Sequence, residues 1–271
     1  MLYKNAKKTL NEINHHKVFF IGLVIIQTLF VIAFAFSFLN FHLKILEDAR
    51  GIIEPLQEAN YNPDTIDAGQ PFLDDPLAVY QSYQAMVRDV YWLVGWLLLI
   101  FIFFGGLLWT GSHQMLSHQK FSIKKFTQMW SKFVATFLVL IIPFLALCYY
   151  IIRLVLFANE PTEVFSSYLK VIGIVFIIIY YFTLTTFSSI TLPWKSFVRR
   201  SFEKTKNLPK TIPVLLINTA LVSFGIYLIY RTLVNQQLTS YMIFATFVLI
   251  VIFVITRLYW IICIKDEKNI S

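Results

Sequence analysis

Long apolar stretches alternate with shorter polar ones along most of the chain. Six of the apolar stretches reach the roughly 20 residues that an α-helix needs to cross a bilayer. None shows the alternation of apolar and polar residues that is typical of a strand in a membrane β-barrel. The pattern predicts a single polytopic, all-α membrane domain over residues 1–271, with spanning helices at about Val18–Leu39, Tyr91–Trp109, Phe133–Phe157, Leu169–Ile190, Ile212–Tyr230 and Tyr241–Cys263.

The composition favours an integral membrane protein over a water-soluble one. Of the 271 residues, 58% are hydrophobic and 14% are charged. Soluble domains contain about 45–50% apolar residues and about 25% charged residues. This excess of apolar surface is typical of a chain whose helices face lipid.

Lys and Arg separate between the two sets of segments that flank the spans. The N-terminal tail, the second and fourth connections and the C-terminal tail hold 16 of the 23 Lys and Arg residues, whereas the other connections hold six. Of the 15 Asp and Glu residues, 11 fall in the second set. Because cytoplasmic segments are enriched in Lys and Arg, we expect a cell-membrane protein with both termini in the cytoplasm.

The N-terminal region has a second interpretation. Its basic residues, its apolar stretch and the sequence Ala33-Phe34-Ala35 are also typical of a secretory signal peptide with a small-residue cleavage site. The apolar run continues to Leu39, which is longer than the apolar core of most signal peptides. We favour an uncleaved first span, and cleavage stays the alternative.

The first connection, residues 40–90, is acidic, with a net charge of −6. Its apolar residues, Leu46, Ile53 and Leu56 among them, recur at helical spacing. We expect helices at 43–60 and 76–90 that bury these apolar stripes on each other as an extracytoplasmic hairpin, closed by a turn around Pro63–Pro71. The alternative is that both helices lie flat on the bilayer, although such helices are usually rich in Lys and Arg.

The acidic residues of this connection have two interpretations. Solvation of an exposed loop is the simpler one. A calcium site is the other, because Asp64, Asp67, Asp74 and Asp75 supply hard oxygen ligands. The regular ligand spacing of an EF-hand is missing from this segment.

Charged residues are scarce within the predicted spans. Arg153 and Arg257 lie near span ends, and we expect both side chains to extend toward the interface. Neutral polar residues form a possible intramembrane cluster in the inner half of the bilayer, either as interhelical hydrogen bonds or as an inward-facing pocket. The cluster comprises Gln27, Tyr180, Thr183, Thr186, Asn218 and Thr219.

Glycine marks the places where helices can approach each other closely. Gly95 and the pair Gly105-Gly106 lie in the second predicted span. The small residues Ala33 and Ser37 are four apart in the first span, as are Thr219 and Ser223 in the fifth, with Gly225 nearby. We expect close helix contacts at these positions.

The sequence contains none of the common enzyme motifs, neither a phosphate-binding glycine loop nor a Gly-x-Ser-x-Gly nucleophile elbow. His113 and His118 are five residues apart, which places them poorly for one metal site on a helix. We therefore expect no catalytic, cofactor-binding or metal-binding residues. The interpretation that we favour is a non-enzymatic scaffold or partner subunit, and the alternative is a transporter or permease subunit with a separate ATPase.

Expected partners follow from the same charges. The basic cytoplasmic segments would contact anionic lipid, which attracts each nearby cation by about 1 kcal/mol. A protein partner or a second copy of the chain would complete the bundle, and we expect no nucleic acid.

Overall fold

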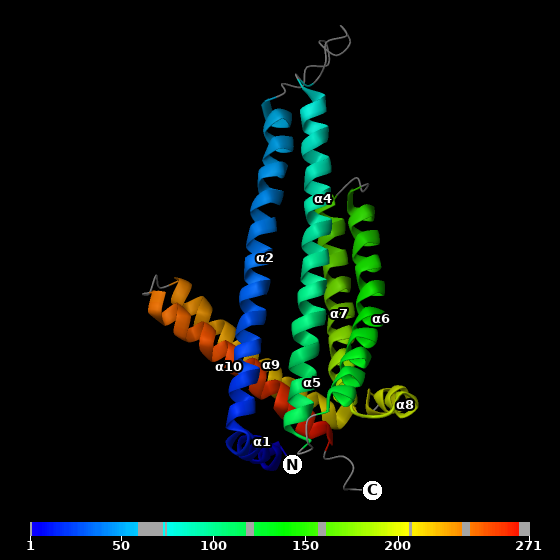
Figure 1. Cartoon of the computed structure of the whole chain (residues 1–271). Helices are drawn as coiled ribbons and strands as arrows, with labels where there is room; N and C mark the ends of the chain where they lie inside the picture. The colour runs from blue at the N-terminus through cyan, green and yellow to red at the C-terminus, as the bar shows by residue number, and fades with distance from the viewer. Residues whose placement is uncertain are drawn as a thin grey trace. The chain divides into compact units, whose positions relative to one another are not determined.

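The computed structural model describes residues 2–58, 73, 75–117, 122–156, 161–205, 208–234 and 239–265. Every regular element within these ranges is helical, as predicted (Figure 1). The elements are α1 (Leu2–His15), α2 (Lys17–Glu58), α4 (Pro76–Ile100), a π-helical segment (Phe101–Gly105), α5 (Gly106–Met115), α6 (Ile123–Leu156), α7 (Pro161–Phe187), α8 (Trp194–Thr205), α9 (Leu208–Val234) and α10 (Thr239–Lys265).

Six helical stretches are long and apolar enough to cross a membrane, which confirms the predicted number and the class of a multi-pass helical membrane protein. The first two have 42 and 40 residues, about twice the length that a bilayer requires. The six are Lys17–Glu58, Pro76–Met115, Ile123–Leu154, Tyr168–Phe187, Thr211–Val234 and Thr239–Ile264.

The chain divides into two compact units. Unit 1 consists of Met1–Thr28 and Phe104–Ser271, and unit 2 consists of Leu29–Phe103. Unit 1 therefore contains α1, the first turns of α2, and all helices from α5 to α10.

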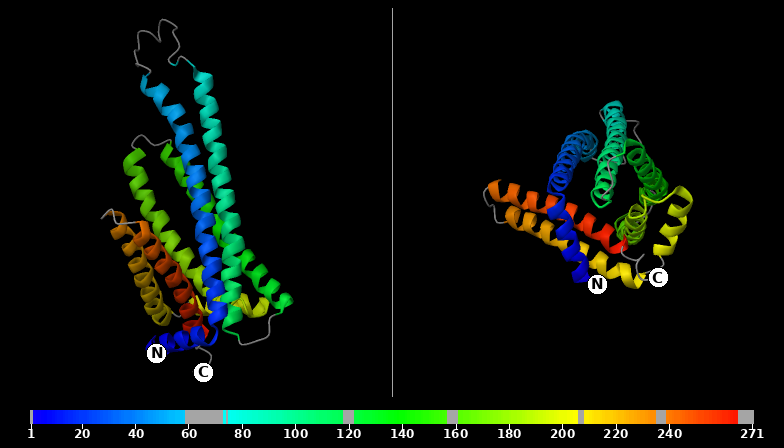
Figure 2. Two further views of the ribbon diagram at one scale, coloured as in Figure 1. Left: turned by 60° about the vertical axis from the view of Figure 1, so that its left-hand side comes forward. Right: turned by 60° about the horizontal axis from the view of Figure 1, so that its bottom comes forward.

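Helix pairs build unit 1. The antiparallel helices α9 and α10 lie side by side, as do α6 and α7 (Figure 2). A Cβ atom added at Gly225 would lie 2.6 Å from a methyl carbon of Leu249, so the predicted close contact at this glycine is confirmed. A Cβ atom at Gly106 would overlap the Trp130 indole, which confirms the second prediction of close approach, between α5 and α6.

The buried core of unit 1 gathers where α5, the end of α7 and the last turns of α10 converge. Leu258, Trp260 and Ile261 of α10 have an exposed fraction of 0%. The Phe187 ring of α7 lies 4.4 Å from the Phe133 ring, measured between centroids. Side chains of several helices are thus packed together at this end of unit 1.

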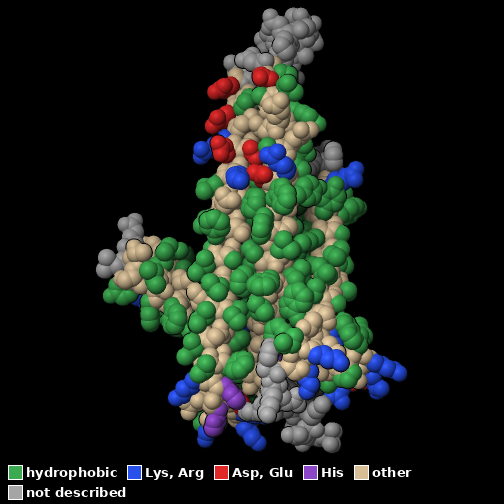
Figure 3. Space-filling view, in the orientation of Figure 1, with side chains coloured by type: hydrophobic (Ala, Val, Ile, Leu, Met, Phe, Trp, Pro, Cys, Tyr) green, Lys and Arg blue, Asp and Glu red, His purple; other side chains and the backbone are tan. Residues whose placement is uncertain are grey.

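Unit 2 consists of the remaining part of α2 and of α4. At the start of α4, Asp75 accepts a hydrogen bond from the backbone N–H of Ala78 at 3.0 Å, and Pro76 occupies the first turn. A Cβ atom at Gly51 would lie 2.7 Å from the Ser82 hydroxyl, so α2 and α4 approach closely there. Asp and Glu side chains gather near the far end of α2 (Figure 3).

The expected burial of the apolar stripe in unit 2 is wrong. Leu46, Ile53 and Leu56 are 45%, 49% and 43% exposed. The face of α2 that turns toward α4 carries Gly51 instead, because a small residue permits the close approach. Among the described residues, these three apolar side chains therefore stay largely exposed. The predicted turn at Pro63–Pro71 and three of the four candidate calcium ligands, Asp64, Asp67 and Asp74, lie outside the described residues.

Candidate functional site

A buried polar contact joins three helices of unit 1 around Arg257 of α10. The Arg257 Nη2 atom donates a hydrogen bond to Oε1 of Gln27 in α2, at 2.6 Å. The guanidinium carbon lies 5.9 Å from the centre of the Trp109 ring in α5. Gln27 and Trp109 are 3% and 8% exposed, so both partners of the cation are buried.

The prediction that Arg257 extends toward the interface is therefore wrong. The amide of Gln27 and the face of Trp109 offer the guanidinium a hydrogen bond and a cation–π contact inside the unit. Arg153, by contrast, is exposed in the last turn of α6, and its extension toward the interface stays a prediction.

One nitrogen of this guanidinium has no such contact. The Nη1 atom of Arg257 is buried and has no hydrogen-bond partner among the described residues. Leaving a buried donor of a charged group without a partner costs more than about 1–3 kcal/mol. A cation held within a candidate span at this cost is a functional candidate.

Two of the predicted polar residues converge on neighbouring residues of α10. Gln27 binds Arg257, and the Nδ2 atom of Asn218 donates to the backbone carbonyl of Thr256 at 3.3 Å. Tyr180 of α7 is 45% exposed. The contacts of Gln27 and Asn218 bring α2 and α9 to one turn of α10.

The other three predicted residues lie apart from this contact. Thr183 donates to the backbone carbonyl of Ile179, at 2.7 Å within its own helix. Thr186 is half-buried, and Thr219 is exposed. The six residues therefore do not line one site in unit 1.

A second polar group holds the end of α7, and sequence reasoning missed it. We call it the α7 end cluster; it consists of His113, Lys132 and Trp260, from α5, α6 and α10. The Nε2 atom of His113 lies 2.9 Å from the carbonyl oxygen of Phe187, and Nε1 of Trp260 donates to the carbonyl of Leu184 at 2.9 Å. These side chains add hydrogen bonds to carbonyls in the last turn of α7, which also accept backbone bonds from Ser188 and Ile190 at 3.2 and 3.4 Å.

Lys132 completes the cluster from α6. It is 5% exposed, and its Nζ atom donates to the carbonyl of Ile190 at 3.2 Å and to that of Leu192. The ammonium also lies 5.9 Å from the centre of the Trp194 ring, at the start of α8. A cation beside the carbonyl end of a helix is favourable, so Lys132 fixes the turn between α7 and α8.

Sequence reasoning missed this cluster because it ended the second span at Trp109 and counted Lys132 as a loop cation. The helical stretch continues to Met115, and His113 is 0% exposed within it. The spacing of four residues from Trp109 to His113 was the available signal, since it places both on one helix face.

Buried hydroxyl groups in the same region bond backbone carbonyls three or four residues earlier in the sequence. Thr110 donates to the carbonyl of Gly106 at 2.6 Å, and Ser112 donates to that of Leu108 at 2.6 Å. Ser188 donates to the carbonyl of Thr185 at 2.6 Å. These hydroxyls are thus committed to backbone carbonyls.

Neither a metal site among the described residues nor a relative of the chain was found. In the part of the chain that the structure describes, His, Cys, Asp and Glu side chains form no group of three that could hold a metal ion. Comparison with known proteins found no match among protein-family models, curated proteins or solved structures.

Proposed function

We propose that this chain is a non-enzymatic scaffold, or a membrane subunit that works with a protein partner. One observation carries the proposal: three buried polar side chains of unit 1 bind backbone carbonyls that belong to other elements of the unit. In the α7 end cluster, His113, Lys132 and Trp260 each contact a carbonyl of α7 or of the turn that follows it. Side chains used in this way hold helices together, which is what a scaffold requires.

The energetics of a bilayer support this role. Between helices surrounded by lipid, packing and hydrogen bonds replace the hydrophobic effect as the main source of association. A neutral interhelical hydrogen bond contributes about 0.6 kcal/mol on average, whereas one from a charged donor contributes about 1.5–3 kcal/mol. Lys132 is therefore the strongest member of the cluster.

In the orientation that we propose, both termini and α8 lie in the cytoplasm of a cell with this protein in its cell membrane. The uneven distribution of Lys and Arg supports this orientation, since 16 of the 23 fall on the side of the two termini. The basic side chains of this side would then face anionic lipid.

The connection over residues 40–90 would form a helical hairpin on the opposite side of the membrane. Its two arms are the far end of α2 and the start of α4, which approach closely at Gly51. The uncovered stripe of Leu46, Ile53 and Leu56 favours contact with a protein partner or with a second copy of the chain.

A second candidate function is a permease subunit that works with a separate ATPase. Arg257 favours it, because its Nη1 atom is buried without a hydrogen-bond partner among the described residues. In a transporter, such a cation could contact an anionic substrate during part of the cycle. The two functions differ in the partner that they require.

Photo-crosslinking in native membranes separates these functions. A photoreactive amino acid in place of Ile53 probes the exposed stripe. The same photoreactive amino acid in place of Glu47, on the acidic side of α2, is the matched control. Another at Lys195 probes the α8 side. The proposal expects a protein crosslink from Ile53 that is absent from Glu47. Crosslinking of Lys195 to an ATPase would favour the permease, and no protein crosslink from either probe would contradict both functions.

A further inference from the structure

Helix α8 carries an apolar stripe that the rest of unit 1 leaves uncovered. Trp194, Val198 and Phe202 are 49%, 50% and 62% exposed. Because they are four residues apart, they follow one line along the helix. The adjacent face is packed, with Phe197 and Ser201 at 3% and 7% exposure. The stripe is thus separate from the face that holds α8 to the unit.

Hydrogen bonds fix the rotation of α8 about its axis. The Nζ atom of Lys204 donates to the Ser189 hydroxyl at 3.0 Å, and the Tyr181 hydroxyl donates to the carbonyl of Thr205 at 3.2 Å. At the other end, Lys132 lies against the Trp194 ring. The helix therefore cannot turn its stripe inward without losing these contacts.

The neighbouring helices would keep α8 at the surface of a bilayer that they span. It lies between α7, which ends at Phe187, and α9, which begins at Leu208. Both α7 and α9 are long and apolar enough to span the membrane. A helix joined to two spans by such short connections lies close to a membrane face, so the bilayer is the nearest cover for its stripe.

Charge around the stripe matches an anionic surface. Lys195 and Arg199 are exposed on the side of the stripe that lies away from the packed face. Lys and Arg side chains gather over α8 (Figure 3). An apolar line with Trp and Phe, bordered by cations, is typical of helices that lie in the interface of an anionic bilayer.

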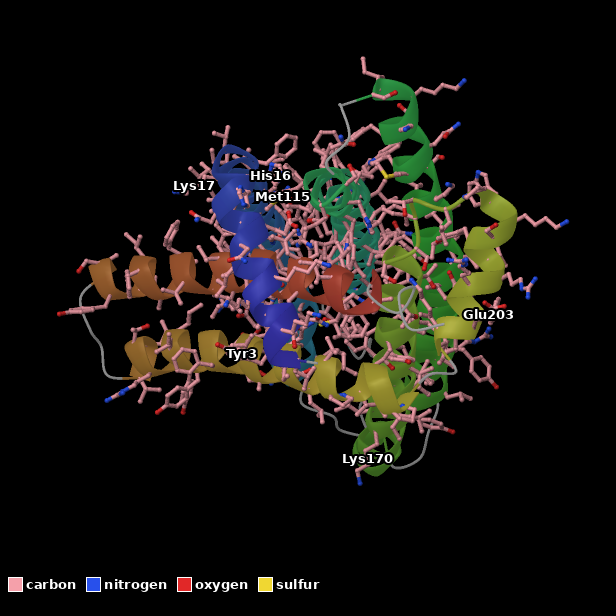
Figure 4. All side chains as sticks on the ribbon, turned by 90° about the horizontal axis from the view of Figure 1, so that it is seen from below. Tyr3, His16, Lys17, Met115, Lys170 and Glu203 are labelled. Atoms are coloured by element: carbon pink, nitrogen blue, oxygen red, sulfur yellow. The ribbon has the colours of Figure 1, made fainter. Side chains whose placement is uncertain are left out.

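Helix α1 repeats this arrangement in the same unit. Asn5 and Thr9 are buried on its packed face, while Tyr3 and Leu10 are 83% and 60% exposed beside it. Lys7 is exposed next to this apolar pair. Figure 4 shows α1 lying across α10, with Tyr3 near one end and α8, which carries Glu203, on the other side of the unit.

We propose that α8, together with α1, is a binding surface for anionic phospholipid. Trp194, Val198 and Phe202 lie at the boundary between head groups and acyl chains, and Lys195 and Arg199 bind head-group phosphates. The proposal deepens the proposed function and rests on the insertion of the six spans.

An ion pair on α8 moderates this surface. The Nε atom of Arg199 lies 2.7 Å from Oε1 of Glu203, and their side chains are 83% and 55% exposed. Glu203 therefore competes with a lipid phosphate for Arg199. Removing this carboxylate should strengthen the preference for anionic lipid, although it adds no new cation.

Fluorescence quenching in nanodiscs tests the proposal with the full-length chain. The background carries Cys148→Ser and Cys263→Ser, and a single fluorophore is attached at Val198→Cys. Brominated phosphatidylglycerol and brominated phosphatidylcholine are the two quenchers. We expect strong quenching, and a preference for the anionic lipid that falls about fivefold for each cation removed in Lys195→Gln and Arg199→Gln.

Matched variants isolate the contribution of α8. Glu203→Gln should increase the anionic preference at residue 198. Lys170→Gln removes an exposed cation at the opposite end of α7 and should leave the preference unchanged. A fluorophore at Ser196→Cys, on the polar side of α8, should be quenched weakly by both lipids.

A fluorophore at Ile142→Cys reports insertion independently, because this residue is 58% exposed within the span of α6. Quenching at 142 without quenching at 198 would overturn the lipid surface, and protection of 198 only in native membranes would assign the stripe to a protein. Equal quenching at 198 by both lipids would overturn the anionic preference. Absence of quenching at 142 would instead refute the proposed membrane function itself.

Discussion

The contact between Arg257 and Gln27 gives the sharpest test of the interior of unit 1. The perturbation is Gln27→Leu, which removes the acceptor 2.6 Å from the guanidinium and keeps an apolar side chain of similar size. Arg257 would then retain the Trp109 ring as its remaining contact among those described above. The matched changes are Arg257→Leu and the double variant.

The magnitude depends on which group is left unpaired. A hydrogen bond to a charged group contributes about 1.5–3 kcal/mol, so Gln27→Leu should lower the free energy of unfolding by about this amount. Arg257→Leu leaves the Gln27 amide unpaired but also removes a cation whose placement within a span is itself costly. Arg257→Leu should therefore destabilise less than Gln27→Leu, and the double variant should recover part of the loss.

Unfolding in mixed micelles, followed by tryptophan fluorescence, measures all four proteins. We expect a coupling energy of about 1.5–3 kcal/mol between the two positions. A coupling near the average of about 0.6 kcal/mol for a neutral bond between membrane helices would refute the reasoning. In that case Arg257 would reach water in solution rather than depend on Gln27.

Three further predictions concern packing, the α7 end cluster and orientation. In the same assay, Gly106→Val should lower the free energy of unfolding by about 1–3 kcal/mol, because the added atoms overlap the Trp130 indole. Gly95→Ala should raise the free energy of unfolding by about 0.5–1 kcal/mol, because nothing lies within 4 Å of the added Cβ atom and Ala favours a helix over Gly. Lys132→Met should cost about 1.5–3 kcal/mol by releasing two carbonyls, and an unchanged free energy of unfolding would show that water replaces the ammonium. In intact cells that express the protein without its native cysteines, an impermeant thiol reagent should label Glu47→Cys and spare Lys195→Cys. The reverse pattern would invert the proposed orientation.

The sequence predicted the features that depend on one helix at a time. Six apolar stretches and their helical class follow from hydropathy alone, and the structure has six such helices. Gly106 and Gly225 were also found, because a residue without a side chain in an apolar helix indicates a close neighbour. Gly95 shows the limit of that rule, since nothing lies within 4 Å of a Cβ atom placed there.

Contacts between distant helices were harder to predict. Because Arg257 lies near a span end, its side chain could extend toward the interface or turn into the unit. The contacts with Gln27 and Trp109, which the sequence does not show, turn it into the unit. Likewise, Leu46 and Ile53 form a stripe in the sequence, but a stripe does not show which face of the helix its neighbour contacts. The periodicity of one helix does not show which other helix it contacts.

The α7 end cluster has a consequence for biosynthesis. Trp260, which donates to the Leu184 carbonyl, belongs to α10, which leaves the ribosome after helices α5 to α9. The buried residues Leu258 and Ile261 arrive with it. Until α10 is inserted, the end of α7 lacks one of its donors, and the nascent helices α5 to α9 expose surfaces that α10 will cover. Unit 1 therefore reaches its final packing only after α10 has been translated and inserted.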